Sequence, residues 1–93
     1  MASSKVFDAK TRKKMLAMVT KPRDARKDEG LNQANFWSHF GVTQSGGSRY
    51  ESGRAIPGPA QLLMALHAAG KITNEDLLAT QEVLGTTFKA STE

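Results

Sequence analysis

Apolar residues recur every three or four positions along most of this chain, a spacing typical of amphipathic helices. The first such stretch follows Asp8, which can cap a helix, and carries Met15 and Val19 four positions apart. Pro22 disfavours a helical conformation at the residue before it, so we expect this helix to end near Thr20.

The next stretch is polar and then becomes aromatic. Residues 21–30 (KPRDARKDEG) leave two interpretations open, a connector or a short extra turn. Asn32 is a good N-cap for the helix that follows. Phe36 and Phe40 lie at i and i+4 with Trp37 beside them, so this short helix has an aromatic face that we expect in the core.

A second short helix is predicted directly afterwards. Gly41 stands where the aromatic helix should stop, and Val42 lies in the turn. Thr43 is a second N-cap, and it opens a helix over residues 44–51 (QSGGSRYE) that stops at Gly53. The two helices are therefore joined by a very short turn.

Two more helices are predicted in the C-terminal half. Pro59 fits the first position of a helix that ends at Gly70. Its leucines are expected to face inward: Leu62, Leu63 and Leu66. The last helix, residues 74–84, follows a capping-box pair with Asp in place of Glu, Thr73 and Asp76. One side of it carries Leu77, Leu78 and Leu84.

The pattern predicts one all-α domain of five helices. Ninety-three residues leave room for a single small core. The predicted division is a flexible N-terminus (1–7), a helical domain (8–84) and a flexible tail (85–93).

Two short capped helices joined by a tight glycine turn form a helix-turn-helix, here over residues 32–53. In that motif the second helix enters the major groove of DNA. Gln44 can pair with adenine and Arg49 with guanine, and Ser45 and Ser48 lie broadly on the same side of the helix.

The same stretch, LNQANFWSHFGVTQSGGSRYESGRAIP, resembles the lambda-repressor-like, XRE/Cro-type family of helix-turn-helix domains. The resemblance is dense over residues 31–70, weaker in the first helix and absent from the tails. The matching residues are Gln33, Gly41, Val42, Thr43, Gln44, Ser45, Ser48, Arg49, Tyr50, Glu51, Gly53 and Pro57.

The resemblance implies roles for individual side chains. Base-edge contacts would come from Gln44, Ser45 and Arg49, with Ser48 as a neighbour. Contacts to the DNA backbone would come from Asn32, Gln33, Thr43, Ser52 and Arg54. In this family the residue at Gln33 often also supports the first glutamine of the recognition helix. Glu51 is interpreted as a structural partner, since phosphates repel a carboxylate.

One departure from the family pattern stands inside the recognition helix. The family normally has Val or Ile at the position of Gly47, between the two helices. We expect a ring of Phe36, Trp37 or Phe40 to fill the space, and Gly46 to let the helix approach DNA closely. The alternative is a loose recognition helix that becomes ordered on binding.

Charge supports a polyanionic partner. Residues 1–30 hold nine Lys or Arg against four Asp or Glu, whereas residues 71–93 carry a net charge of −2. Within the first helix, Lys13 and Lys14 would add phosphate contacts and a steep salt dependence. The alternative for such a charge run is an ordinary solvated helix face.

Other functional classes lack the residues that they need. The chain has no cysteine, and His39 and His67 have no partner at ligand spacing, so we expect no metal site. Neither a phosphate-binding loop nor a catalytic Ser/His/Asp set is recognisable, so we expect no cofactor and no enzymatic activity. No apolar run approaches the roughly 20 residues of a membrane span, and we expect a cytoplasmic protein.

The sequence thus predicts a DNA-binding transcriptional regulator, most simply a repressor. One recognition helix reads few base pairs, so a homodimer on an inverted repeat is expected. The dimer surface is assigned to Leu77, Leu78 and Leu84, with the equal alternative that they only complete the core. No small-molecule ligand is expected. A rival interpretation is an antitoxin or a protein–protein adaptor with the same fold.

Overall fold

The computed structural model describes residues 6–85, and this part of the chain is entirely helical. Its helices are α1 (Ala9–Thr20), α2 (Pro22–Asp28), α3 (Gln33–Ser38), α4 (Gln44–Glu51), α5 (Gly58–Ala68) and α6 (Asn74–Leu84). The all-α prediction is confirmed. The predicted number of five is one too low, because the polar segment left open in the sequence forms α2. Pro22 stands in its first turn, where proline lacks only an N–H that would be unpaired anyway.

Local capping fixes several helix ends where the sequence places them. Asp8 caps α1 by accepting a hydrogen bond from the backbone N–H of Thr11 at 2.7 Å. The capping box before α6 is complete: the Thr73 hydroxyl accepts from the Asp76 N–H at 3.0 Å, and the Asp76 carboxylate accepts from the Thr73 N–H at 2.9 Å. Each bond satisfies a donor that the first helical turn leaves unpaired.

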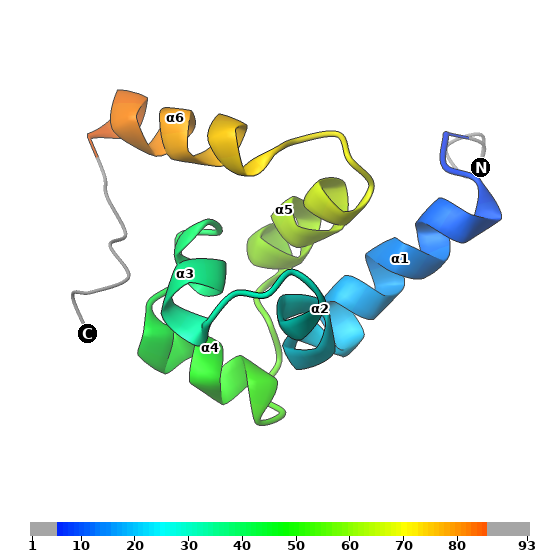
Figure 1. The fold of residues 1–93 in the computed structure, drawn as a ribbon, viewed down its shortest axis with the longest axis horizontal. Helices are drawn as coiled ribbons and strands as arrows, with labels where there is room; N and C mark the ends of the chain where they lie inside the picture. Colours follow the sequence, from blue (N-terminus) through cyan, green and yellow to red (C-terminus); the bar gives the residue numbers. More distant parts are fainter. Residues whose placement is uncertain (1–5, 86–93) are drawn as a thin grey trace.

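The helices divide the molecule into two sides (Figure 1). α1 packs along α5, while α3 packs on α4, and α2 lies between these two pairs with contacts to α1 and α4. α6 leaves the loop after α5 and lies at the edge opposite to α4. The N-terminal half of α1 points away from α3 and α4.

The core is small and largely aromatic. Its buried side chains are Met18, Phe36, Trp37, Phe40, Ile56, Met64 and Leu77. Phe36 lies at the centre, edge-on to the Trp37 ring at 5.3 Å and to the Phe40 ring at 5.4 Å between centroids. Edge-to-face packing is favourable for aromatic rings. The expected aromatic face of α3 is therefore confirmed.

The leucines of α5 do not face inward as predicted. Leu62 is 69% exposed, and Leu63 and Leu66 are each 36% exposed, whereas Met64 is fully buried. Ala60 also packs against the core, four positions before Met64 on the same side of the helix. This stripe of core-facing residues turns Leu62 to the opposite side, so counting leucines alone selected the wrong face.

The predicted flexible termini fall mostly outside the described residues, which exclude 1–5 and 86–93. Phe7 is half-buried, and its ring lies 5.9 Å from the ammonium nitrogen of Lys71. Gly85 ends α6 in the left-handed conformation with φ of 71°. Within residues 6–85, none of the helices has the length and apolar character needed to cross a membrane.

Candidate DNA-binding surface

The turn between α3 and α4 is closed by the backbone. Gly41 has φ of 74°, a conformation that favours glycine. The N–H of Val42 then returns to the carbonyl of Trp37 at 3.1 Å. Thr43 caps the new helix by accepting from the Gly46 N–H at 3.1 Å. The predicted helix over residues 44–51 is thus confirmed, with a tight turn before it.

Gly47 is explained by the ring that packs on it. A Cβ atom at this position would lie 2.2 Å from Cδ1 of Trp37, a separation that real Cβ atoms do not show. Of the three rings expected to fill this space, it is therefore Trp37 that does so, and its side chain is fully buried. The packing of Trp37 thus accounts for Gly47 without a loose recognition helix.

Gly46 has a different environment. A Cβ atom there would lie 3.1 Å from Cγ1 of Val42 and 3.4 Å from Oγ1 of Thr43. The missing side chain would thus point toward the turn that precedes the helix. Packing against this turn accounts for Gly46, and the expected close approach to DNA stays a prediction.

A buried carboxylate joins three helices. Glu51 at the end of α4 has a side chain with no exposed surface. Its two oxygens accept from Nε and Nη2 of Arg26 at 2.8 and 3.0 Å, from Nε1 of Trp37 at 2.8 Å and from Nε2 of Gln33 at 3.1 Å. Arg23 adds an ion pair at 3.5 Å. We call these five residues the Glu51 network; they confirm Glu51 as a structural partner.

The Glu51 network keeps the carboxylate charged. Burial by itself would raise the pKa of Glu51, but the hydrogen bonds from Arg26, Trp37 and Gln33 outweigh burial and lower its pKa to about 2. The hydrogen bond to Glu51 in turn raises the pKa of Arg26. The positive charges on α2 therefore neutralise Glu51, and a carboxylate on the recognition helix does not repel DNA.

The side of α4 opposite to the Glu51 network is polar and open to solvent. Its residues are Ser45, Ser48, Arg49 and Ser52, at i, i+3, i+4 and i+7, and we call them the outer face of α4. All are exposed except Ser48, which is half-buried. The structure therefore brings together three of the predicted base-contacting residues, Ser45, Ser48 and Arg49, and leaves Gln44 exposed in the first turn.

Arg49 does not pair with the neighbouring carboxylate of Glu51. The Glu51 carboxylate is taken up by Arg26 and Arg23 from α2. Arg49 is exposed on the outer face of α4, and its backbone carbonyl accepts from the N–H of Arg54 at 3.0 Å. The exposed Arg54 follows the helix directly, so both arginines lie at its C-terminal end.

The predicted backbone-contacting residues of the motif have mixed surroundings. Asn32 and Thr43 are exposed caps, and Asn32 accepts from the N–H of Asn35 at 2.8 Å. Ser52 donates its hydroxyl to the carbonyl of Ser48 at 2.9 Å. Gln33 is half-buried, and its amide donates to Glu51, so its observed partner is Glu51 where the family resemblance implied Gln44.

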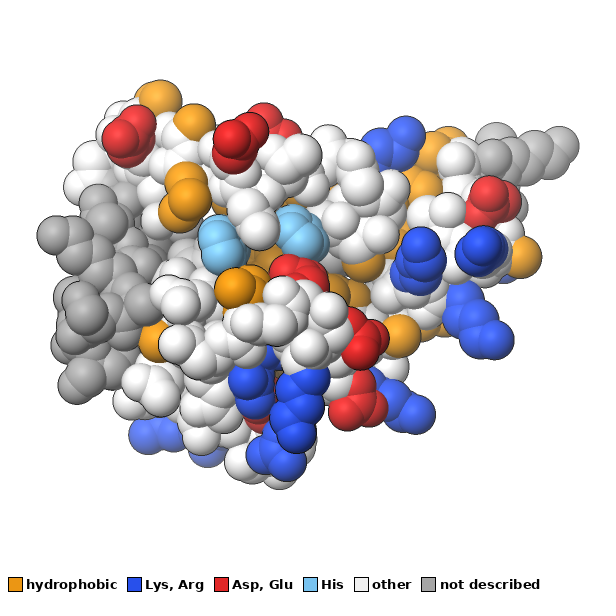
Figure 2. Space-filling view, viewed as in Figure 1, with side chains coloured by type: hydrophobic (Ala, Val, Ile, Leu, Met, Phe, Trp, Pro, Cys, Tyr) orange, Lys and Arg blue, Asp and Glu red, His pale blue; other side chains and the backbone are white. Residues whose placement is uncertain are grey.

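Lys13 and Lys14 are exposed, but they lie apart from the motif. Both belong to the part of α1 that extends away from α4 (Figure 1). Figure 2 shows one group of Lys and Arg side chains over α1 and another low in the view, near α2. The structure thus separates these two lysines from the other predicted contact residues.

Two further basic residues lie beside α4, one on α2 and one directly before α2. Lys21 and Arg23 line a cleft of about 240 Å³ together with Tyr50 of the recognition helix and Gly53 after it. Sequence reasoning missed them because residues 21–30 had no assigned structure. The spacing of the arginines could have indicated this arrangement, because Arg23 and Arg26 are three positions apart and lie on one side of a helix.

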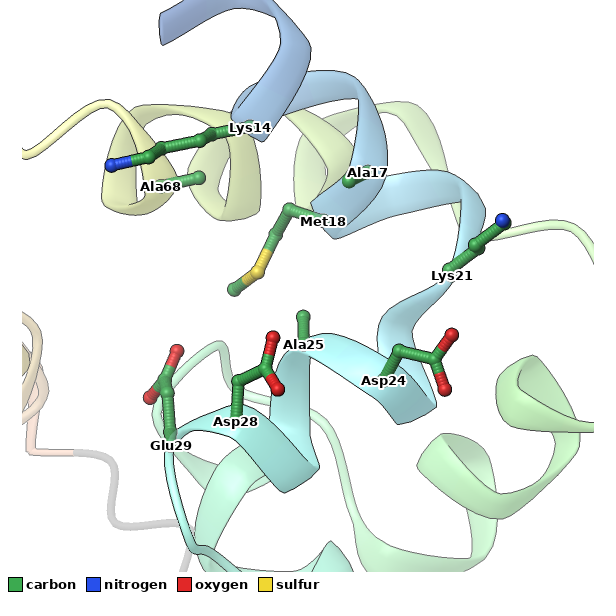
Figure 3. Close-up of a pocket in the computed structure, with 9 residues that line it drawn as sticks. All are labelled: Lys14, Ala17, Met18, Lys21, Asp24, Ala25, Asp28, Glu29 and Ala68. Atoms are coloured by element: carbon green, nitrogen blue, oxygen red, sulfur yellow. The ribbon is translucent and has the colours of Figure 1, made fainter. Parts of the chain in front are cut away.

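The acidic residues of α2 lie at a second groove, although Asp24 also lines the cleft beside α4. Asp24 and Asp28 line a groove of about 590 Å³ between α1 and α2, with Met18 at its floor and Lys14 and Lys21 across from them (Figure 3). Their position, four residues apart, places them on one side of α2. α2 therefore presents its arginines to α4 and Asp28 to α1, with Asp24 lining both hollows.

The leucines assigned to a dimer surface divide between core and solvent. Leu77 is buried in the core, so it does not belong to a free surface. Leu84 lies two turns further along the same side but is 70% exposed, and Leu78 is 47% exposed. Gln81 holds α6 to the end of α3 through the carbonyls of Ser38 at 2.9 Å and His39 at 3.3 Å.

Two capped helices joined by a glycine turn, with a polar outer face on the second, define a helix-turn-helix domain. Residues 23–67 match the family described as the RsaL-like HTH domain, from the second residue of α2 to the last residue but one of α5. This match supports a helix-turn-helix DNA-binding family, as the sequence predicted; it does not extend to the XRE/Cro subtype. Neither a curated protein nor a solved structure matched the chain.

Proposed function

We propose that this protein is a transcriptional repressor that binds an inverted-repeat operator as a homodimer, with α4 in the major groove. The observation that carries the proposal is the division of α4 into two sides. Glu51 and Gly47 fix one side to α2 and α3, while Ser45 and Arg49 are exposed on the other. A recognition helix needs this combination, because base readout depends on side chains held in register with the groove.

The proposed base contacts lie at the beginning and middle of α4. Gln44 would pair with adenine through its amide, and Arg49 with guanine through its guanidinium. Ser45 and Ser48 would contact neighbouring base edges or phosphates. Ser45, Ser48 and Arg49 share the outer face of α4, and Gln44 is exposed in its first turn, which supports this assignment.

The proposed backbone contacts surround the helix. The predicted residues Asn32, Thr43, Ser52 and Arg54 are exposed at the ends of α3 and α4, where phosphates would pass. Three further sets of residues would contribute to DNA binding in different ways. We add Lys21 and Arg23, because they line a cleft beside α4. Gln33 would act mainly by holding Glu51. Lys13 and Lys14 would contribute through long-range attraction.

The proposed homodimer and repressor role are based on the limited sequence discrimination of a single recognition helix. A single recognition helix discriminates poorly against a genome, so two copies on two half-sites are proposed. Repression then requires only that the dimer occupy its operator. It needs no catalysis and no cofactor, and the proposed place of action is the cytoplasm. Exposed Leu78 and Leu84 support α6 as part of the dimer surface.

The first test is selection from random DNA duplexes, followed by titration of the selected sequence and a scrambled one at two salt concentrations. We expect an enriched inverted repeat that is bound far more tightly than the scramble. Salt-sensitive binding without an enriched sequence would contradict sequence reading and leave only a basic surface.

Arg49→Ala tests base readout directly. Loss of a bidentate contact should weaken operator binding by about 1–3 kcal/mol and relax the preference at one base position. Lys71→Ala is the matched control, because it removes the same charge from an exposed residue outside the motif. Equal losses of Arg49→Ala on operator and random DNA would contradict its base-reading role.

A rival function is protein binding, as in an adaptor or an antitoxin. Such a protein does not need Gln44 or Arg49 on its surface. In such a protein, alanine at both positions would leave binding of the protein partner unchanged. In the proposed function, the same double substitution should abolish specific DNA binding. The polar outer face of α4 favours DNA over a protein partner, because protein interfaces have an apolar centre.

A further inference from the structure

Two exposed apolar surfaces lie outside the helix-turn-helix. The first is a groove of about 360 Å³ between α1 and α5, and we call it the α1/α5 groove. Leu16 on α1 is 64% exposed and Leu62 on α5 is 69% exposed at this groove. Met15, Val19 and Ala65 complete its apolar lining. Large apolar side chains gathered at one place on a surface mark an interaction site.

The second surface is the side of α6 that faces away from the core. Leu78 and Val83 are 47% and 85% exposed there. Glu75 and Glu82 lie on the same side of the helix, and with Leu78 they line a shallow groove of about 380 Å³. We call these four residues the outer face of α6.

The charges around the two surfaces are opposite. α1 carries four Lys or Arg and no acidic residue, and Arg12 lies at the α1/α5 groove itself. α6 carries three Asp or Glu and no basic residue. An apolar groove with a cation at its edge and an apolar helix face with carboxylates at its edge are complementary in both respects.

We propose that the outer face of α6 packs into the α1/α5 groove of a second copy of this chain. In a two-fold dimer the contact occurs twice, because each copy offers both surfaces. Arg12 of one copy would face Glu75 or Glu82 of the other, around Leu16 and Leu62. The inference rests on the proposed homodimer and names its interface. It leaves the outer face of α4 free, because none of these residues belongs to α3 or α4.

The test is the oligomeric state of the full chain, measured by sedimentation over a range of concentrations. Leu62→Glu and Arg12→Glu should each raise the dissociation constant of the dimer about tenfold or more, because they place a carboxylate in the groove. Lys10→Glu is the matched control. It makes the same charge change on α1, at an exposed residue that does not line the groove, and should leave the dimer intact.

A charge exchange tests the assignment of the partner surface. Glu82→Arg alone should weaken the dimer like Arg12→Glu, and the two changes together should restore most of the affinity. Restoration would identify α6 as the occupant, since a different protein in the groove would not respond to Glu82. Thermal unfolding of each variant checks that these exposed substitutions leave the fold intact.

Three results would overturn the inference. They are a chain that stays monomeric, a dimer that resists both Arg12→Glu and Leu62→Glu, and equal weakening by Lys10→Glu. Binding of a single half-site by each variant separates this failure from failure of the proposed function. A monomer that still prefers its half-site would refute the interface and keep the base-reading role of α4.

Discussion

The two ends of this molecule are held in different ways. α4 is fixed by close packing of Gly47 on Trp37 and by a buried carboxylate that joins it to α2 and α3. α6 is held by one buried leucine, Leu77, by the Gln81 amide and by a hydrogen bond between Asn74 and His67, and most of its surface is exposed. The comparison teaches that position is fixed most tightly where the proposed function depends on orientation, whereas the more exposed helix presents surface for an interface.

The largest effect should follow from removal of the buried carboxylate. Glu51→Ala leaves Arg26 without its partner and removes acceptors from Gln33 and Trp37, so we expect a loss of about 3–5 kcal/mol in the free energy of unfolding. Urea unfolding measures it. Glu75→Ala, on exposed α6, is the control and should change stability by less than about 0.5 kcal/mol. Equal effects would remove the contrast between the two helices.

Acid should loosen the same region. Because the pKa of Glu51 is lowered from 4.5 to about 2, its charged form stabilises the folded state above about pH 4.5. This contribution, up to about 3 kcal/mol, is lost as the pH falls through about 2. Unfolding should be measured between pH 7 and pH 2 for the wild type and for Glu51→Gln. A variant with unchanged pH dependence would show that Glu51 is not the group responsible.

The close packing of α4 on α3 can be tested at two neighbouring glycines. Gly47→Ala forces the Trp37 ring to move and should destabilise the protein by about 1–3 kcal/mol, despite the better helix propensity of alanine. Gly46→Ala should have a smaller effect, since its Cβ lies 3.1 Å from the side chain of Val42 and this contact needs only a small shift. Trp37 fluorescence reports the ring directly. If both variants unfold alike, the Trp37 contact does not explain Gly47.

The smallest effect on stability is expected at the far end of α6. Leu84→Ala should change the free energy of unfolding by no more than about 0.5 kcal/mol, because the side chain is 70% exposed. Leu77→Ala, on the same side of the helix, should cost about 2–5 kcal/mol. A large loss for Leu84→Ala would show that the whole helix is packed on the domain.

Much of the candidate site could be predicted because its signals are local. The glycine turn, the caps and the spacing of the exposed residues on α4 involve positions only a few residues apart. The basic contribution of α2 could not be predicted, because residues 21–30 contain few apolar positions that reveal a helix. The inward face of α5 was also missed, since its core contact uses Ala60 and Met64 where leucines were expected.

The sequence by itself determined the boundaries of α1, α4 and α6, because capping groups, glycine and proline act on backbone within about one helical turn. It also determined that α4 would present Gln44 and Arg49. Only the tertiary structure decided which ring fills the space at Gly47 and which donors surround Glu51. Those donors lie 14 to 25 positions away along the chain. Contacts over such separations depend on how whole helices pack, and residue spacing does not encode that packing.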